Sequence, residues 1–268
     1  MICSIDKLRI VAFAAKKNSK EISSTNDEGE IETIKVLYGT DALVGEIFNR
    51  LGFNDDAKTN SYVRSKYSLK HGFSAFEKRN GLLLFECGGT FFLEPNPLPN
   101  TAMIFSLCKE LSGFNAGVSE AHLAITGNFT KDFHAFATRL KRDWDVGKCL
   151  VRTFEENKKI STLMAGSSVS SLVVYNKSLE LNKKVSRKSQ ESRANYIKNF
   201  ENKYSSLEGQ TRIEFRFRSS RLLTKFSDLL KQQKYQEAIE ELLAQGLKRY
   251  KLPTPLVNKL KKSISKGI

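Results

Sequence analysis

The sequence lacks the segments that mark secreted and membrane-spanning proteins. No apolar run approaches the roughly 20 residues needed to span a bilayer, and the N-terminus has no signal-peptide pattern. The four cysteines, Cys3, Cys87, Cys108 and Cys149, are widely spaced and show no CxxC or other metal-binding spacing. We therefore expect no disulfide framework, and we expect buried thiols in a reducing, cytoplasmic compartment.

Several catalytic motifs are also missing. The chain has no GxxxxGK[ST] phosphate loop, no GxGxxG, no HExxH and no GxSxG, which leaves P-loop nucleotide hydrolysis and serine-type acyl transfer without sequence support. The pair of histidines separated by one hydrophobic residue, used by many DNA-nicking enzymes, is absent, because the only histidines are His71, His122 and His134. His134 falls on the polar side of its predicted helix, and we expect it to be solvated.

What the sequence has in excess is positive charge. The 268 residues carry 44 Lys and Arg against 29 Asp and Glu, which gives a net charge of +15 and an isoelectric point near 9.6. The composition is 40% hydrophobic and 10% aromatic, sufficient for a sizeable core. Such an excess of charge predicts a polyanionic partner; nucleic acid is the first expectation and an anionic membrane surface the weaker one.

The hydrophobic pattern predicts strands and helices in irregular alternation. Strands are predicted at 8–14, 33–38, 81–87, 121–127, 170–177 and 211–218, and a loop at the prolines of 95–99. Helices are predicted at 41–51, 101–111, 130–144 (with Thr130 as N-cap), 178–204 (one helix or a helix pair), 220–232 and 235–247. The order favours an α+β fold with a mainly antiparallel central sheet flanked by helices. We divide the chain into a domain at 1–247 and a basic tail at 248–268, which is either a DNA-contacting arm or a solvated helix.

Polar side chains interrupt the apolar pattern of several predicted strands. Glu86 ends an apolar run, Glu120 and His122 share one side of their strand, and Glu214 stands among arginines on the most regular strand of the sequence. Tyr175 shares a face with Lys177. Taken singly, each has a structural interpretation: a salt-bridged rim glutamate, a hydrogen-bonded strand histidine, or a tyrosine that packs with its hydroxyl in water.

Together these residues fit cleavage and rejoining of a DNA strand. Attack on a phosphodiester by a phenol requires a tyrosine that loses its proton well below the ordinary pKa of about 10, and a neighbouring cation such as Lys177 favours this. A divalent metal on carboxylate and imidazole ligands would polarise the scissile phosphate.

The sequence resembles rolling-circle replication initiators, both the filamentous-phage gene II type and the plasmid Rep_trans type. The resemblance is carried by Val173-Val174-Tyr175-Asn176-Lys177 within 161–184, by the strand and helix at 212–226, by 119–129 and by the acid-bearing strand at 83–89. It covers roughly residues 80–230 in order and spacing. It implies a Rep/relaxase-like nicking domain without a His-hydrophobic-His motif, in a phage or plasmid of a bacterial host.

The resemblance also implies roles for individual residues. Tyr175 would be the nicking nucleophile, Lys177 would lie beside the phosphotyrosine, and Glu86, His122 and Glu214 would bind Mg²⁺ or Mn²⁺. The family has aspartate where this chain has His122. Three alternatives follow: imidazole is a ligand and favours Mn²⁺ or another transition ion, Glu120 substitutes for it, or the metal site is weakened and the chain binds DNA without cutting it efficiently.

The expected function is therefore initiation of rolling-circle replication by DNA nicking and strand transfer, through a covalent 5′-phosphotyrosine intermediate at an origin of single-stranded or hairpin character. The alternative is a non-catalytic basic DNA-binding protein, a degenerate initiator acting as a regulator. A host helicase, a host polymerase and a second copy of the chain are further expected partners, and Tyr196 and Tyr204 are fallback nucleophiles. The residues expected to contact DNA are Arg64, Lys66, Lys70, Lys183, Lys184, Arg187, Lys188, Arg212, Arg216 and Arg218.

Overall fold

A nine-stranded antiparallel sheet organises the chain. The computed structural model describes residues 1–13, 19–25, 31–37, 66–68, 73–77, 82–89, 91–93, 97–112, 116–144, 150–186, 194, 197–198, 201–202 and 209–264. The strand order is β4-β5-β6-β1-β7-β11-β10-β9-β8, and each neighbouring pair is antiparallel. The strands of the large sheet are β1 (Ile2–Phe13), β4 (Lys66–Ser68), β5 (Phe73–Glu77), β6 (Leu82–Cys87), β7 (Gly117–Gly127), β8 (Val151–Glu156), β9 (Lys159–Gly166), β10 (Ser170–Asn176) and β11 (Thr211–Phe217). The separate pair β2 (Ser19–Thr25) and β3 (Ile31–Leu37) forms a second sheet.

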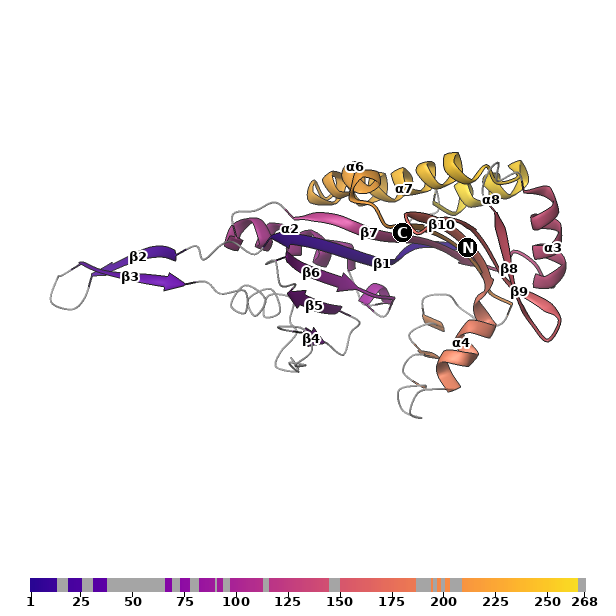
Figure 1. The fold of residues 1–268 in the computed structure, drawn as a ribbon, viewed down its shortest axis with the longest axis horizontal. Helices are drawn as coiled ribbons and strands as arrows, with labels where there is room; N and C mark the ends of the chain where they lie inside the picture. Colours follow the sequence, from indigo (N-terminus) through magenta and orange to yellow (C-terminus); the bar gives the residue numbers. More distant parts are fainter. Residues whose placement is uncertain are drawn as a thin grey trace.

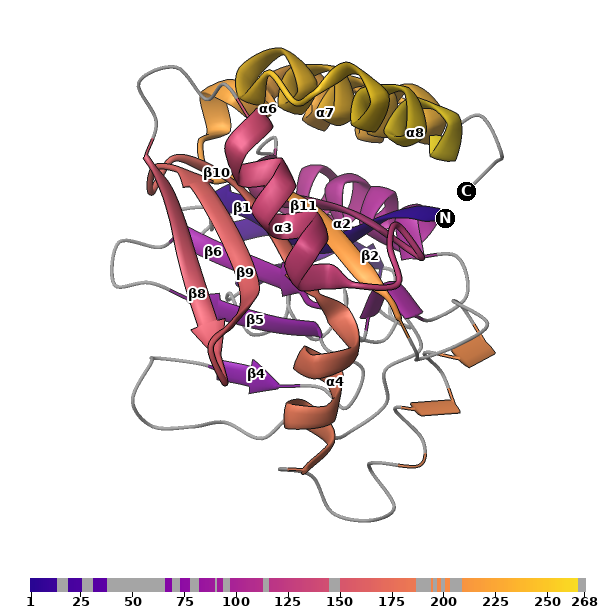
Figure 2. The same cartoon turned by 90° about the vertical axis from the view of Figure 1, so that its right-hand side faces the viewer.

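The helices divide between the two faces of the large sheet. Three C-terminal helices, α6 (Ser220–Lys231), α7 (Tyr235–Tyr250) and α8 (Thr254–Ile264), lie together over one face, whereas α4 (Lys177–Ser186) projects on the other side (Figures 1 and 2). Helix α3 (Phe133–Asp143) packs against β9 and β10, and α2 (Pro97–Ser112) packs against α6 and the short 3-10 turn Phe91–Leu93. The sheet therefore has one face covered by helices and one face on which charged side chains gather.

Strand alternation produces this division. In β11, Ile213, Phe215 and Phe217 are fully buried in the core, and Gly246 of α7 lies so close to Phe215 that an added Cβ would stand 2.4 Å from its Cδ1. The intervening residues, Arg212, Glu214 and Arg216, are on the opposite face, because successive side chains of a strand point to opposite sides of a sheet. The same alternation in β1, β6, β7 and β10 gives the sheet its polar face.

An irregularity in β1 adds an acid to the polar face. The pairing of β1 with β7 shifts register between Ile5 and Lys7, so Asp6 has no partner on β7. Such a bulge breaks the two-residue alternation, and its extra residue is re-aimed. The Asp6 carboxylate reaches Arg212 of β11, on the same face as Lys7.

Most predicted elements are present, and the α+β class with an antiparallel sheet flanked by helices is confirmed. The N-cap of α3 is Asp132, whose carboxylate accepts from Ala135 N, so the prediction of Thr130 was wrong by two residues. Pro97 and Pro99 lie in the first turn of α2 and not in a loop, because a proline there forgoes a backbone donor that has no partner in the helix. The prediction of a solvated His134 was also wrong, since its Nδ1 accepts a hydrogen bond from Ile160 N of β9.

The C-terminal segment packs into the domain. The expected boundary between residues 247 and 248 falls inside α7, and Tyr250, Leu252, Leu256 and Leu260 are buried. Trp144 Nε1 donates to the Tyr250 carbonyl at 2.6 Å, which ties the end of α7 to the end of α3. The segment up to Ile264 therefore contributes to the core, while the lysines of α8 remain exposed.

Other expectations concern cysteines, membranes and undescribed segments. Cys3, Cys87 and Cys108 are buried free thiols as predicted, and burial raises the pKa of Cys3 and of Cys108 to about 12. No helix in the described ranges is long and apolar enough to cross a membrane. Cys149, the helix predicted at 41–51 and most of the helix predicted at 178–204 lie outside the described residues, apart from α4 and five positions between 194 and 202.

Candidate active site on the polar face of the sheet

A continuous line of hydrogen bonds crosses the middle of the polar face. Tyr175 Oη on β10 donates to Glu214 Oε2 on β11 at 3.1 Å, and the other oxygen of Glu214 lies 2.8 Å from Nδ1 of His122 on β7. The second ring nitrogen of His122 lies 2.9 Å from Glu120 Oε1 on the same strand. The structure thus joins four residues singled out in the sequence, Tyr175, Glu214, His122 and Glu120, in one connected chain of contacts.

Glu86 joins this line through two cations of β1. Lys7 Nζ lies 3.3 Å from Glu86 and 3.5 Å from Glu120, and Arg9 contacts the same two carboxylates at 2.6 and 3.1 Å. The register places Arg9 directly opposite both glutamates, since Arg9 pairs with Glu86 on β6 and with Glu120 on β7. Glu86 therefore belongs to the same network, but three strands, β1, β7 and β11, separate its strand from that of Tyr175.

Arginines of β11 balance the acids in the centre of the network. Arg216 contacts Glu214 through Nε at 2.8 Å and through its terminal nitrogen at 3.2 Å, while Arg218 Nε contacts Glu120 at 3.0 Å. Arg212 is 2% exposed and donates to Asp6 at 2.6 Å and to Thr126 Oγ1 at 2.9 Å. Its register partner on β10 is Tyr175. A buried guanidinium therefore lies beside the tyrosine.

Lys177 begins α4 immediately after the strand that carries Tyr175. Its side chain is buried, its Nζ lies 5.7 Å from the centre of the Tyr175 ring, and it contacts Glu180 one helical turn later at 2.5 Å. Its backbone N–H donates to Gln210 just before β11. The strand-to-helix junction therefore fixes this ammonium beside the phenol.

The electrostatics of the network favour ionised carboxylates. Burial by itself opposes ionisation of Glu214 and Glu120, but hydrogen bonds from His122 and from arginines outweigh it and hold both pKa values well below their usual range. Burial would lower the pKa of His122, but its bonds to Glu120 and Glu214 reverse the direction and raise it. The raised pKa favours the protonated ring of His122, in which each N–H faces a carboxylate.

The pKa of Tyr175 is shifted in the direction opposite to that of the two carboxylates. Tyr175 is 9% exposed; burial raises its pKa well above the ordinary value, and Glu214 acts in the same direction, while Arg212 acts against them. In this arrangement the phenol keeps its proton and donates a hydrogen bond to the ionised Glu214. Loss of that proton requires a change in the surroundings, such as an electrophile at Oη.

The predicted metal set does not fit this arrangement. A ligand histidine needs a free nitrogen lone pair, but both nitrogens of His122 lie against carboxylates. The oxygens of Glu86 face Lys7 and Arg9. Within the described ranges, no group of three or more His, Cys, Asp and Glu side chains is arranged to hold a metal ion. Metal binding through Glu86, His122 and Glu214, or through Glu120, stays a prediction from the sequence, and no chemical step below passes through a metal.

The described residues that were expected to contact DNA lie in three places: the network on the polar face, helix α4 and strand β4. Arg216 and Arg218 lie at the partly exposed edge of the network, and Arg212 is buried within it. Lys183 is on α4, exposed and paired with Glu156 at 2.8 Å. Lys66 lies on β4 and Lys184 on α4. Arg64, Lys70, Arg187 and Lys188, like the fallback nucleophiles Tyr196 and Tyr204, lie outside the described residues.

Sequence reasoning gave no site role to three members of the network, Asp6, Lys7 and Arg9. Lys7 and Arg9 alternate with Leu8 and Ile10, which is the signal that could have placed them on the polar face. Asp6 had no such signal, because only the bulge brings it to this face. The central position of β1, between β6 and β7, turns these residues into the link between Glu86 and the rest of the network.

Comparison with known proteins adds one structural match. No protein-family model matches the sequence, and no curated protein matches it significantly. The chain is similar to a solved structure described as a rolling circle replication initiator protein from Geobacillus stearothermophilus, with 11% sequence identity and a TM-score of 0.49, over 93% of this chain and 85% of that one. A match with such low identity and a TM-score below 0.5 assigns no activity to this chain.

Proposed function

We propose that this chain nicks DNA and transfers the cleaved strand to start rolling-circle replication, with Tyr175 as the nucleophile. The observation that carries the proposal is the hydrogen bond of 3.1 Å from Tyr175 Oη to Glu214, beside the buried cations Arg212 and Lys177. A tyrosine in contact with an ionised acceptor and next to cations has the partners that phosphoryl transfer needs. The net charge of +15 supplies attraction for a polyanionic substrate.

The reaction is a substitution at phosphorus. Tyr175 Oη attacks the scissile phosphorus, so that the Oη–P bond forms as the bond from phosphorus to the 3′ oxygen breaks. The phenol proton passes to the Glu214 carboxylate, and the departing 3′ oxygen takes a proton from water. The products are a 5′-phosphotyrosyl linkage and a free 3′-hydroxyl, which can prime a polymerase.

The direction of the pKa shifts dictates the timing of this step. Burial holds the pKa of Tyr175 above its ordinary value, so a free phenolate does not form first. The pKa of Glu214 is lowered, which makes it a weak base. Proton transfer therefore accompanies formation of the Oη–P bond, and the cations Arg212 and Lys177 stabilise the charge that develops on the phosphate oxygens.

Phosphate must also compete with acids already on the polar face. In the described part of the chain, Arg216, Arg212 and Lys177 each contact a carboxylate. A DNA phosphate that pairs with one of these cations displaces the carboxylate bound to it, and this opens access to Tyr175. Substrate binding and opening of the site are therefore coupled in this proposal.

One observation favours the second candidate, a DNA-binding protein without cleavage activity. Tyr175 is only 9% exposed and lies in a network whose carboxylates are already matched with cations. Such a closed network would hold the sheet together whether or not the tyrosine reacts. The two candidates differ in a single product, the covalent protein–DNA adduct.

The test is a nicking assay on supercoiled DNA that carries the gene for this chain. Wild-type protein should convert it to open circles and leave a covalent adduct that maps to the peptide containing Tyr175. Tyr175→Phe should give neither product while its DNA affinity stays within about twofold. Tyr235→Phe, a tyrosine of α7 on the helix side, is the matched control and should react like wild type.

The result decides between the candidates. Binding without any adduct from wild-type protein supports the non-catalytic function, and an adduct that persists in Tyr175→Phe refutes the nucleophile. Parallel reactions with EDTA, Mg²⁺ or Mn²⁺ test the metal predicted from the sequence: cleavage in EDTA contradicts a metal requirement. An adduct at Tyr196 or Tyr204 would move the nucleophile to one of the fallback positions.

A further inference from the structure

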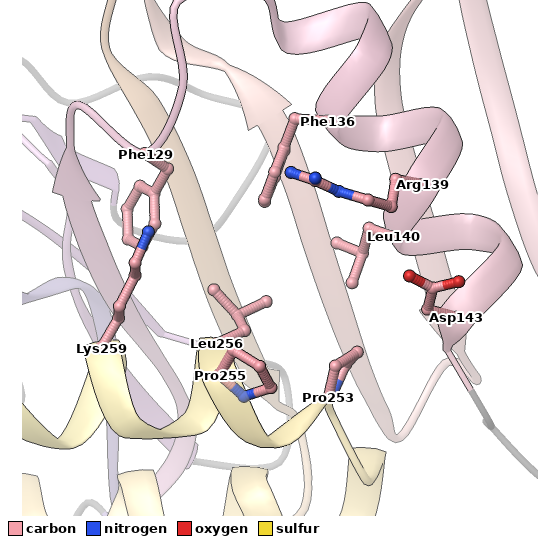
Figure 3. Close-up of a pocket in the computed structure, with 9 residues that line it drawn as sticks. All are labelled: Phe129, Phe136, Arg139, Leu140, Asp143, Pro253, Pro255, Leu256 and Lys259. Carbon is pink, nitrogen blue, oxygen red and sulfur yellow. The ribbon is translucent and has the colours of Figure 1, made fainter.

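A pocket of about 330 Å³ lies on the helix side of the sheet, between α3 and α8 (Figure 3). It is separate from the charged network, which is on the other face. The volume is at the low end of the range for small-molecule sites, so the pocket has room for one small group and not for a large cofactor. Its walls come from three elements: the end of β7, helix α3 and the start of α8.

The floor of the pocket is aromatic and apolar. Phe129, just after β7, and Phe136 of α3 have ring centroids 6.5 Å apart with planes inclined by 32°, and both rings are only partly buried. Leu140 and Leu256 complete the apolar lining, and both are buried. Half-exposed aromatic faces next to aliphatic side chains form a surface on which a planar ring can stack.

The rim of the pocket carries two cations. Arg139 of α3 and Lys259 of α8 extend into the pocket from opposite walls (Figure 3), and both are exposed. Neither has an ion-pair partner within 4 Å among the residues that the structure describes. The acid of the rim, Asp143, pairs with Arg142 at 2.7 Å and also interacts electrostatically with Arg139 at longer range, so that three cations face one acid. The charge left at the rim is therefore positive, complementary to a phosphate.

The pocket lies at the end of the sheet nearest to Tyr175. Tyr175 pairs with Arg212, and Arg212 pairs with Thr126 on β7, so these three residues lie in one row across the sheet. Phe129 follows Thr126 by three residues, beyond the end of β7 at Gly127. A polynucleotide strand that rounds this end of the sheet would pass from one site to the other.

We propose that this pocket binds one unpaired nucleotide of single-stranded DNA. The base stacks on Phe129 and Phe136, and a flanking phosphate contacts Arg139 and Lys259. The inference rests on the proposed function for the source of the strand, and it adds a second contact on the opposite face that would hold the strand while its backbone lies at Tyr175. Binding is measured separately from cleavage, so the two proposals can fail independently.

The test uses a fluorescent hairpin oligonucleotide whose single-stranded tail carries one abasic nucleotide, moved along the tail from one oligonucleotide to the next. The junction of the hairpin fixes the register. With wild-type protein, the abasic site should weaken binding about 5- to 100-fold at one or two adjacent positions and little elsewhere, as expected for loss of one stacked base. Anisotropy titrations give the affinities.

Substitutions in the pocket test whether the sensitive nucleotide of the tail is the one that binds there. Phe136→Leu keeps an apolar side chain but removes one of the two aromatic faces. It should weaken binding of the intact tail toward the affinity of the sensitive abasic tail, and it should cost less on that abasic tail than on the intact one. Phe154→Leu, an exposed phenylalanine of β8 outside the pocket, is the control and should keep the wild-type profile. A profile unchanged by Phe136→Leu, or a profile without a sensitive position, overturns the proposal.

A second substitution acts on the phosphate and removes no core packing. Lys259→Gln should lower affinity several-fold more than Lys261→Gln, an exposed lysine on the same helix that does not line the pocket. Equal effects of the two variants overturn the phosphate contact. Competition with free dTMP separates the two sources of a nucleotide: displacement of the tail by micromolar dTMP would assign the pocket to free nucleotides and contradict a site for the strand. If wild-type protein does not nick DNA while the abasic profile remains, the proposed function is refuted and the pocket assignment stands.

Discussion

Glu214 is the residue on which the polar face depends most, and Glu214→Gln tests this. The substitution keeps the shape of the side chain and removes its charge. Glutamine has one acceptor oxygen and one NH2 donor, so one side of the former carboxylate loses its acceptor. That side is either the one that accepts from Tyr175 Oη at 3.1 Å and from Arg216 at 3.2 Å, or the one that faces His122 and Arg216, each at 2.8 Å. The side chain is 3% exposed, so water cannot replace these contacts without rearrangement.

Breaking a buried ion pair by removing one partner generally costs about 3–5 kcal/mol. The cost should lie near the lower end here, because Arg216 is partly exposed and His122 can release its proton. For a chain of this size, a loss of about 3 kcal/mol corresponds to a decrease of the melting temperature by about 6–12 °C. The loss of stability should be larger below pH 6.5, the ordinary pKa of histidine, than at higher pH. Below that pH His122 is protonated, and in the variant its charge faces an uncharged glutamine.

Urea denaturation followed by the fluorescence of Trp144, the only tryptophan, measures this loss. The indole is buried and bound to the Tyr250 carbonyl, so its emission reports unfolding of the contact between α3 and α7. Glu241→Gln is the matched control, because Glu241 pairs with the exposed Lys225 and should contribute no more than about 1 kcal/mol. Equal losses in the two variants would refute the reasoning that the buried network holds the sheet together.

Three further predictions follow from the same structure. Gly246→Ala should lose about 1–2 kcal/mol of unfolding free energy in urea denaturation despite the gain in helix propensity, because its Cβ would stand 2.4 Å from Cδ1 of the fully buried Phe215. Gly117→Ala is the control: its Cβ meets open space, and its stability should stay within about 0.5 kcal/mol of wild type. The folded-state pKa of His122 is raised, so its contribution to stability is complete below pH 6.5 and is lost as the pH rises through the raised value; the urea midpoint of His122→Asn should fall less over that range than that of wild type. DNA affinity in anisotropy titrations should fall on the order of tenfold or more between 50 and 200 mM salt, and an affinity that barely responds would contradict binding dominated by phosphate contacts.

The sequence predicts the polar face well where strands alternate without interruption. In β11 the two-residue period assigned Arg212, Glu214 and Arg216 to one face, and in β7 it placed Glu120 with His122. The period follows from backbone geometry and needs no knowledge of neighbours. The order of strands across the sheet is set by pairings between distant segments, and the sequence pattern did not predict that β1 lies between β6 and β7.

The hairpin of β8 and β9 was missed because it lies at the edge of the sheet. Only Val151, Thr153 and Glu156 of β8 are half-buried and its other residues, including Phe154, are exposed. A register shift also interrupts the pairing between Phe154 and Glu155. The turn uses Asn157 and Lys158 with φ of 51° and 61°, a conformation that Asn-Gly would have marked more clearly. An edge strand with little buried surface leaves little hydrophobic pattern to detect.

The exact contacts of the site could not come from the pattern either. Alternation places Glu86, His122 and Glu214 on one face. From the sequence alone, three such residues are potential metal ligands, because the side chains that contact them are not known. The bulge at Asp6 and the insertion of Lys7 and Arg9 change the chemistry, because they supply the charges that the acids need. Acids and a histidine on one face of a sheet can form a metal site or a charge-balanced network, and side-chain contacts alone distinguish the two.

Charge is distributed so that affinity and reactivity have different sources. On the polar face the acids Asp6, Glu86, Glu120 and Glu214 are nearly matched by the cations that contact them, so this face contributes little to the net charge of +15. Most of the excess must lie elsewhere, in places such as the exposed lysines of α8. Long-range attraction of DNA therefore depends on surfaces outside the network, whereas phosphate gains access to Tyr175 only by exchanging places with a carboxylate. Variants within the network should consequently alter cleavage far more than affinity, and variants of the exposed lysines should do the reverse.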